Sequence, residues 1–207
     1  MYDYQTDSLW VQATGEAIHG QYRGSRLSRL PATQSTWQTW RDLHPETRAL
    51  ARSNSSDFWV DSYTSYYRTG KGIKYDRHAP LTIGLAVILD QVQKIYPFPE
   101  LEKQPVLIDM VGGMRILVVY HPPSKTAVAF ACENAGRALD FTLVETGTSD
   151  VTLREKSSGS IWSGLTGRCK SGLANDAVLR QINCSQFVVE NWKLHYPKGG
   201  VYQRGSN

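Results

Sequence analysis

The sequence predicts a single β-rich domain of the α+β class, in which an antiparallel β-meander joins two related strand–turn–strand–helix segments. Three observations lead to this prediction. Apolar runs of strand length recur through the middle of the chain and are separated by short turn sequences. Two stretches near the ends of the chain resemble each other, and each closes with a short helical pattern. The 207 residues suffice to bury a sizeable core without a disulfide or a metal.

The composition is that of a folded, soluble protein. Hydrophobic residues make up 41% of the chain and charged residues 20%, which excludes a disordered, collagenous or coiled-coil protein. The 23 basic and 19 acidic residues are scattered, so the net charge of +4 indicates neither a nucleic-acid nor an anionic-membrane partner. The longest apolar stretch, residues 83–89, is too short for a transmembrane helix. The given chain also begins without the pattern of a signal peptide.

The two ends of the chain match without a gap when the sequence is shifted by 152 residues. Residues 1–45 and 153–197 share nine identities over 45 positions, whereas composition alone gives about three. Tryptophan and glycine carry much of the match, and the roles of both depend on packing and backbone geometry. We therefore predict an internal repeat. The identical pairs are Ser8/Ser160, Trp10/Trp162, Thr14/Thr166, Gly15/Gly167, Gly20/Gly172, Leu27/Leu179, Gln34/Gln186, Trp40/Trp192 and Pro45/Pro197.

Each copy is predicted to form a short strand, a Thr-Gly turn, a second strand that ends at a glycine, and then a helix. In the first copy, Ser35 or Thr36 can cap the helix and Trp40 lies on its apolar face. In the second copy, Ser185 can cap a helix in which Trp192 takes the same place. Helices of about two to three turns need such a buried face to be stable.

Two different regions separate the copies, which we assign to residues 1–50 and 151–200. Residues 51–80 are rich in Ser, Tyr and Gly, and their many aromatic side chains predict a long, ordered connection rather than a linker. Residues 81–150 are predicted to form the β-meander. Near-continuous apolar runs within it, such as residues 116–119, indicate strands that are covered on both faces.

The second copy follows the meander, whereas the first copy begins at Met1. If a complete unit consists of a meander followed by one strand–turn–strand–helix copy, the chain holds one and a half units. We therefore expect a protein partner or a homo-oligomer to cover an exposed edge or apolar face of the first copy. The alternative is that Met1 is not the true start and that an upstream segment completes the first unit.

Three stretches resemble an uncharacterised family named domain of unknown function 3179. They are MYDYQTDSLWVQATGEAIHG, LPATQSTWQTWRDLHPET and VGGMRILVVYHPPSKTAVAF. The resemblance covers residues 1–55 and 80–197, and it implies an N-terminally truncated member. It also implies that longer members carry segments like HEIVND and YCPLCGT in the first meander, whose His and Cys-x-x-Cys suit a soft metal such as copper or thiol redox chemistry. The family supplies no activity.

In this chain, His121 and Ser124 stand where the resemblance would place the paired cysteines, and Asp109 is retained. These two positions therefore cannot form a dithiol here, and of the two residues only His121 could bind a metal. As a ligand or base it needs a partner, which His78 or Asp109 can supply only through the fold. The alternative is a surface histidine in a strand-to-strand turn.

A second candidate binding surface lies in residues 51–80. Aromatic faces stack on sugars or bases, and nearby cations hold phosphate or carboxylate groups. The alternative is that this segment packs onto its own domain. The candidate residues are Tyr63, Tyr66, Tyr67 and Arg68.

Cys169 and Cys184 occupy positions of the second copy where the first copy has Ala17 and Ala32. Two cysteine substitutions in one copy favour a linked pair, so we predict a disulfide, which would contribute about 3 kcal/mol. It would also imply an oxidising, extracytoplasmic compartment. Two buried free thiols are the alternative. Cys132 lies in a strand-like run and is expected in the core.

The preferred function is a non-catalytic binding or assembly module, for which no cofactor is expected. The rival is a metal- or redox-linked protein, or a small enzyme, that uses His121 as the remnant of the family site. A near-stoichiometric metal that is lost in a His121→Ala variant would favour the rival.

Overall fold

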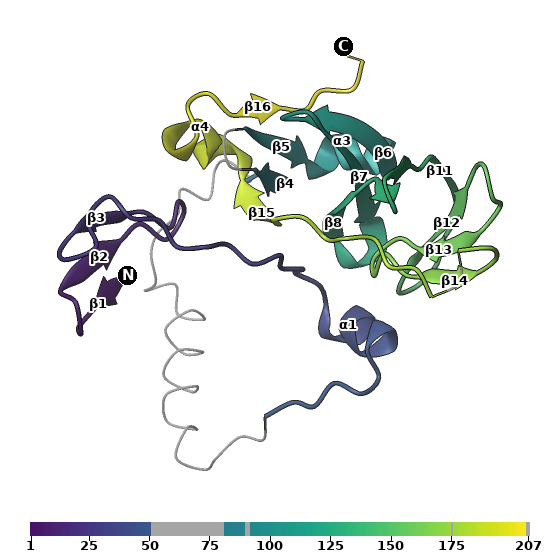
Figure 1. The fold of residues 1–207 in the computed structure, drawn as a ribbon, viewed down its shortest axis with the longest axis horizontal. Helices are drawn as coiled ribbons and strands as arrows, with labels where there is room; N and C mark the ends of the chain where they lie inside the picture. Colours follow the sequence, from purple (N-terminus) through teal and green to yellow (C-terminus); the bar gives the residue numbers. More distant parts are fainter. Residues whose placement is uncertain (51–80, 90–91, 175, 206–207) are drawn as a thin grey trace.

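The computed structural model describes residues 1–50, 81–89, 92–174 and 176–205, and its architecture is β-rich with few helices, as the sequence predicts (Figure 1). Neighbouring strands pair antiparallel except β16, which runs parallel to β5. Among the described residues, no helix has the length and apolar character needed to cross a membrane.

The first fifty residues form a three-stranded sheet and a helix. The sheet has the order β1-β2-β3. The elements are β1 (Tyr2–Asp3), β2 (Ser8–Trp10), β3 (Ala17–His19) and α1 (Trp37–Leu43). As predicted, Thr36 caps α1, because its Oγ1 accepts a hydrogen bond from the Thr39 amide at 3.3 Å.

The body of the molecule contains three larger sheets and a two-stranded hairpin, β9–β10. The sheets have the strand orders β15-β4-β5-β16, β6-β7-β8 and β11-β12-β13-β14. The strands are β4 (Ile83–Ile88), β5 (Gln93–Pro97), β6 (Val106–Val111), β7 (Met114–His121), β8 (Thr126–Ala131), β9 (Glu133–Asn134), β10 (Arg137–Ala138), β11 (Phe141–Thr146), β12 (Val151–Glu155), β13 (Ile161–Ser163), β14 (Cys169–Ser171), β15 (Cys184–Val188) and β16 (Gly200–Val201). The helices of the body are α3 (Phe98–Lys103), α4 (Trp192–His195) and the 3-10 turns η2 (Pro122–Ser124) and η3 (Val189–Asn191).

The β6-β7-β8 sheet is the middle layer of the body. Ile116 and Val118 of β7 belong to a core shared with β4, β5 and α3, whereas Leu117 and Val119 belong to a core shared with the β11–β14 sheet. All four side chains are fully buried, which confirms the prediction of strands covered on both faces. A third cluster joins the other face of β4 and β5 to Trp192 of α4.

The sequence predicts strands on either side of an Asp90-Gln91 turn and further strands after Gly113, but no element over residues 98–111, where the structure has α3 and β6. Asp109 interrupts the apolar pattern of residues 106–111, so this pattern does not indicate a strand. In the structure, Asp109 Oδ2 pairs with Lys94 Nζ at 2.6 Å. The Phe98-Pro99 pair reads as a break between strands, yet proline is well tolerated in the first turn of a helix, where it lies in α3. The predicted turn at residues 90–91 lies outside the described residues.

The helix predicted to start near Ser185 begins later, so this expectation was wrong. Residues 184–188 form β15 instead and pair with β4 in five register positions, from Cys184↔Val87 to Val188↔Ile83. The sheet satisfies backbone groups that a helix would otherwise have to satisfy, and this tertiary pairing overrides the local helical pattern. Helix α4 starts only at Trp192.

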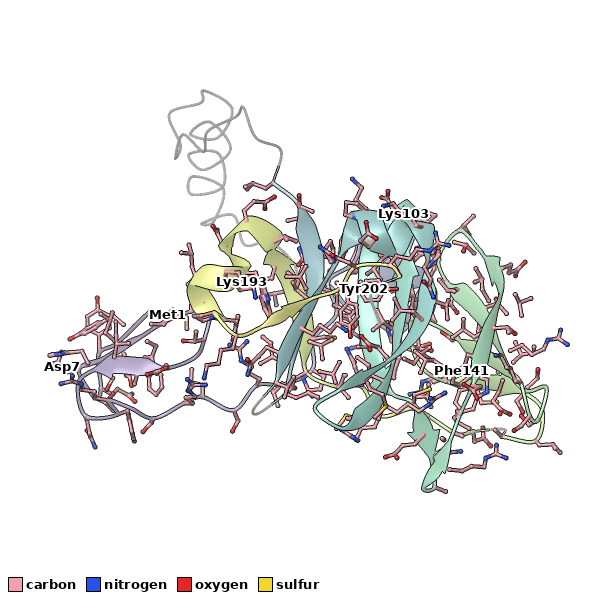
Figure 2. The ribbon with its side chains drawn as sticks, turned by 90° about the horizontal axis from the view of Figure 1, so that it is seen from above. Met1, Asp7, Lys103, Phe141, Lys193 and Tyr202 are labelled. Carbon is pink, nitrogen blue, oxygen red and sulfur yellow. The ribbon has the colours of Figure 1, made fainter. Side chains whose placement is uncertain are left out.

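The β1–β3 sheet stands apart from the layered body (Figure 1). The chain then crosses the body below β15 and β8 and reaches α1, which lies on the side of β14. In Figure 2, Met1 and Asp7 belong to this separate lobe, while Phe141 lies at the opposite end of the molecule.

Candidate interaction surface

His121 is buried at the end of β7 and hydrogen-bonded through both ring nitrogens. Its Nε2 lies 2.9 Å from the carbonyl oxygen of Gly147, which can only accept, so in the neutral imidazole Nε2 carries the proton. Nδ1 then accepts from the Ser124 hydroxyl at 2.7 Å. The Ser124 oxygen is in turn 2.7 Å from Thr126 Oγ1. These contacts fix the turn between β7 and β8.

The Ser124–His121 pair therefore looks like a nucleophile and its base, but its surroundings differ from those of an active site. Both side chains are buried, with His121 0% and Ser124 8% exposed. The expectation of a surface turn histidine is corrected by this burial. In the described ranges, no three His, Cys, Asp or Glu side chains gather as a possible metal site.

Asp109 lies in a separate cluster on β6, away from the His121 hydrogen bonds. Its Oδ2 contacts Lys94 Nζ at 2.6 Å and accepts from the Tyr96 hydroxyl at 2.7 Å. Burial alone would raise the pKa of Asp109, but these two hydrogen bonds, the Lys94 charge and the Met110 amide together lower it. Burial and the neighbouring Asp109 raise the pKa of Tyr96. The Lys94 ammonium also lies 5.6 Å from the Tyr202 ring centre, so the cluster ties β16 to β5 and β6.

The predicted disulfide between Cys169 and Cys184 is not formed, since all three cysteines are free and buried. Cys184 belongs to the core between the β4–β5 and β6–β8 layers, whereas Cys169 belongs to the core beside the β11–β14 sheet. Each thiol fills a small apolar site of its own, as in the alternative interpretation. Burial raises the pKa of Cys184 to about 11, which keeps this thiol protonated near neutral pH.

The remaining predicted site residues lie outside the described part of the chain. They are Tyr63, Tyr66, Tyr67, Arg68 and His78.

Residues 1–45, here called the first segment, and residues 153–197, the second segment, make corresponding backbone hydrogen bonds. The bond from Gly15 N to Val11 O measures 2.7 Å, and its counterpart from Gly167 N to Ser163 O measures 2.9 Å. Both glycines have positive φ, 71° and 67°. Further corresponding bonds are Val11→Glu16 and Ser163→Arg168, Ala17→Ser25 and Cys169→Ala177, Leu27→Gly15 and Leu179→Gly167, and His44→Trp40 and Tyr196→Trp192.

Side-chain contacts correspond in the same way. The Ser8 hydroxyl accepts from the Tyr22 amide at 3.2 Å, and the Ser160 hydroxyl accepts from the Ala174 amide at 3.3 Å. The ring centres of Trp40 and His44 are 4.2 Å apart, and those of Trp192 and Tyr196 are 4.5 Å apart. These similarities are local: each contact joins residues of one segment.

The two segments differ in how far their apolar side chains are covered. Leu27 is 48% exposed and Leu30 is 83% exposed, whereas their counterparts Leu179 and Ile182 are 3% and 2% exposed. The same trend holds for the tryptophans and for Ala32 and Cys184: Trp10 and Trp40 are half-buried and Ala32 is exposed, while Trp162, Trp192 and Cys184 are buried. The covering side chains of the second segment come mainly from residues 83–146.

The first segment touches the body through polar contacts and through Leu43 of α1, which packs against the core beside the β11–β14 sheet. The Arg29 guanidinium donates to the Tyr196 hydroxyl at 3.0 Å, and that hydroxyl donates to the Ala13 carbonyl at 3.0 Å. Thr126 Oγ1 and Ser35 Oγ lie 3.1 Å apart, at hydrogen-bond distance. These contacts anchor the crossing residues but leave Leu30 exposed. We call Trp10, Leu27 and Leu30, with the backbone of residues 28–36, the first-segment face.

The sequence indicated that the first copy lacks a meander, but it named no residue of the first-segment face. The signal was present in the aligned copies, because Leu27/Leu179 is an identical apolar pair and Leu30/Ile182 a conservative one. Sequence alone did not give the contrast in burial, which depends on where residues 83–146 pack.

A family described as "Protein of unknown function (DUF3179)" has a model that matches residues 1–83 and 81–207, which together span the chain. No curated protein and no solved structure matches the sequence.

Proposed function

The chain belongs to the DUF3179 family, whose description gives no activity, and we propose that it is a non-catalytic binding or assembly module. The first-segment face is its binding surface, and the two segments are copies of one structural unit. The observation that carries the proposal is the contrast between 83% exposure of Leu30 and 2% exposure of Ile182. An apolar face that is buried in one copy and open in the other is suited to a partner.

The hydrogen bonds of the two segments support the idea that they are copies. The same donors and acceptors pair at a constant spacing of 152 residues, as in Leu27→Gly15 and Leu179→Gly167, both at 2.9 Å. The first segment thus has the same turn hydrogen bonds as the second segment, which is packed on residues 83–146. Its Ser8 and Ala17 are buried like Ser160 and Cys169, although its apolar face is open.

A metal or redox function receives less support from the site that would serve it. Both ring nitrogens of His121 are held by hydrogen bonds to Ser124 and Gly147, so neither has a free lone pair directed at open space. Asp109 is held by Lys94 and Tyr96 in a different cluster. These residues act as structural links between elements.

Site-specific photo-crosslinking tests the proposal. A photoreactive amino acid replaces Leu30 in the chain, which is then illuminated in cells that naturally express the protein. We expect a discrete protein adduct. The matched control carries the same group in place of Leu173, which is 90% exposed but lies outside the first-segment face. Adducts of equal yield at both positions, or none at position 30, would contradict the proposal.

A further inference from the structure

The second segment binds residues 83–146, the meander, along three stretches of backbone. At the first, β12 pairs with β11, with Glu155 opposite Phe141. At the second, the Ile182 amide donates to the Ala129 carbonyl at 3.0 Å and the Ala131 amide donates to the Arg180 carbonyl at 2.9 Å. At the third, β15 pairs with β4. One continuous piece of chain thus satisfies three edges of the second segment.

The three corresponding edges of the first segment are Tyr2–Asp3, residues 28–30 and residues 32–36. Among the strands that the structure describes, β1 pairs with β2 alone. Within the described chain, no backbone–backbone hydrogen bond reaches residues 28–35. Unpaired backbone of this kind, next to exposed apolar side chains, is suited to β-strand addition.

A glycine shows how closely the meander fits the second segment. A Cβ added to Gly167 would meet a ring carbon of Phe130 at 2.6 Å, so the aromatic ring lies directly on the backbone of this turn. At the corresponding Gly15, an added Cβ would meet nothing nearer than Leu27 Cβ at 3.6 Å. The Thr-Gly turn of the first segment therefore keeps the backbone shape that accepts an aromatic ring.

Two contacts between the segments join residues whose counterparts line a common cavity. The Gln181 amide donates to Thr33 Oγ1 at 2.9 Å. Their counterparts, Arg29 and Ser185, line one cavity of ≈ 520 Å³. The same relation holds near the helix ends. The Tyr196 hydroxyl donates to the Ala13 carbonyl. The counterparts of these two residues, His44 and Leu165, line a cavity of ≈ 360 Å³.

This pairing of contacts with shared cavities fits an approximate two-fold axis between the segments. Gln34 and Gln186, which are counterparts of each other, line a common cavity, as residues close to the axis would. A two-fold rotation carries Ser35, which contacts Thr126 of the meander, onto Phe187. The rotation therefore places a meander for the first segment beside Phe187, which lines two open cavities.

We propose that the first-segment face docks a second β-meander of the same kind as residues 83–146, supplied from outside residues 1–207. This inference rests on the proposed function and specifies its partner. A second copy of this chain does not fit, because its meander is already covered by its own second segment: Val119, Val128 and Phe130 are buried. The partner must offer such a meander with its segment-binding side free.

A grafted chain tests the fit. Residues 81–152 are placed directly before Met1 of the full chain, since Leu153, the counterpart of Met1, follows Thr152 in the natural sequence. We expect amide exchange in residues 28–36 to slow by about tenfold or more, as backbone edges become paired. The matched control carries Phe130→Ala in the grafted meander only, and we expect it to lose most of this protection.

A second graft guards against a mismatch between the sequences of the two segments. It adds Ala13→Leu, Leu30→Ile and Ala32→Cys, which give the first segment the residues of the second. Protection of residues 28–36 in either graft supports the proposal, and its absence in both overturns it. A native chain that forms a stable homodimer with residues 28–36 protected would also overturn it, because the occupant would then be a second copy.

The two failures are distinguishable. If photo-crosslinking at position 30 gives no adduct, the proposed function fails whatever the grafts show. If an adduct forms but neither graft protects residues 28–36, the binding function stands and the meander is the wrong partner.

Discussion

The first and second segments share corresponding turns and backbone hydrogen bonds in different surroundings. Gly15 and Gly167 have nearly the same φ, and the hydrogen bonds around them correspond one by one. The apolar side chains of the two segments nevertheless differ in burial, since Leu27 is 48% exposed and Leu179 is 3% exposed. The comparison teaches that the turns and their hydrogen bonds are specified within the segment, whereas burial of its apolar face is supplied by the meander.

The largest expected difference is between Trp162→Ala and Trp10→Ala. Trp162 is buried and packs edge-to-face on Phe141, with ring centres 5.7 Å apart, whereas Trp10 is half-buried beside Tyr22. We expect losses in the free energy of unfolding of about 3–5 kcal/mol for Trp162→Ala and about 1 kcal/mol for Trp10→Ala. Urea denaturation of both variants measures the difference. Equal losses would mean that the first segment is as well covered as the second.

A smaller difference is expected between Gly172→Ala and Gly20→Ala. Both glycines have positive φ, 108° and 87°, and an added Cβ would approach backbone at Ser160 or Asp7 closer than 3 Å. Both substitutions therefore disrupt a turn. We expect Gly172→Ala to cost about 2 kcal/mol of global stability.

Gly20→Ala should instead raise amide exchange mainly in residues 1–27, because that sheet stands apart from the body. Hydrogen exchange combined with thermal unfolding separates the two effects. A drop in global stability of the same size for Gly20→Ala would contradict the expected independence of the first segment.

The smallest difference concerns acid stability at Glu155 and its counterpart Asp3. Burial alone would raise the pKa of Glu155, but hydrogen bonds from Ser157 and Ser158 lower it from 4.5 to about 2. Because the folded pKa is depressed, this carboxylate stabilises the fold above about pH 4.5, and the contribution disappears as the pH falls toward about 2. Glu155→Gln should therefore flatten the dependence of Tm on pH in this window.

Asp3→Asn is the matched variant. The Thr6 hydroxyl and the Gln5 amide lower the pKa of Asp3 as well, but this side chain belongs to the separate β1–β3 sheet. We expect little change in the Tm of the body between these pH values. Thermal unfolding followed by circular dichroism compares the two variants, and identical pH profiles would refute the distinction.

Much of the fold was accessible from the sequence because it follows from local patterns. The buried run in β7 and the cap at Thr36 were both predicted from periodicity and residue type. The change from helix to β15 was not, since residues 184–188 become a strand only because β4 offers an edge far away in sequence. The Cys169–Cys184 pairing failed for a similar reason: sequence positions cannot tell which cysteine enters which core.

In the candidate sites, too, local sequence predicts which neighbouring residues meet, whereas burial depends on distant parts of the chain. His121 and Ser124 are close in sequence, and the turn between β7 and β8 brings them together, but their burial depends on Gly147 and on the packing of distant strands. Asp109 meets Lys94 and Tyr96 instead of His121. The first-segment face could be located by aligning the copies, while its exposure required the three-dimensional arrangement.

Amide hydrogen exchange of the isolated full chain tests the contrast between the two segments most directly. In the second segment, residues 180–188 are paired with β8 and β4, and we expect exchange slowed by orders of magnitude. In the first segment, residues 28–36 should exchange at close to the rate of an unstructured chain. Comparable strong protection of both stretches in the isolated monomer would contradict an uncovered first-segment face.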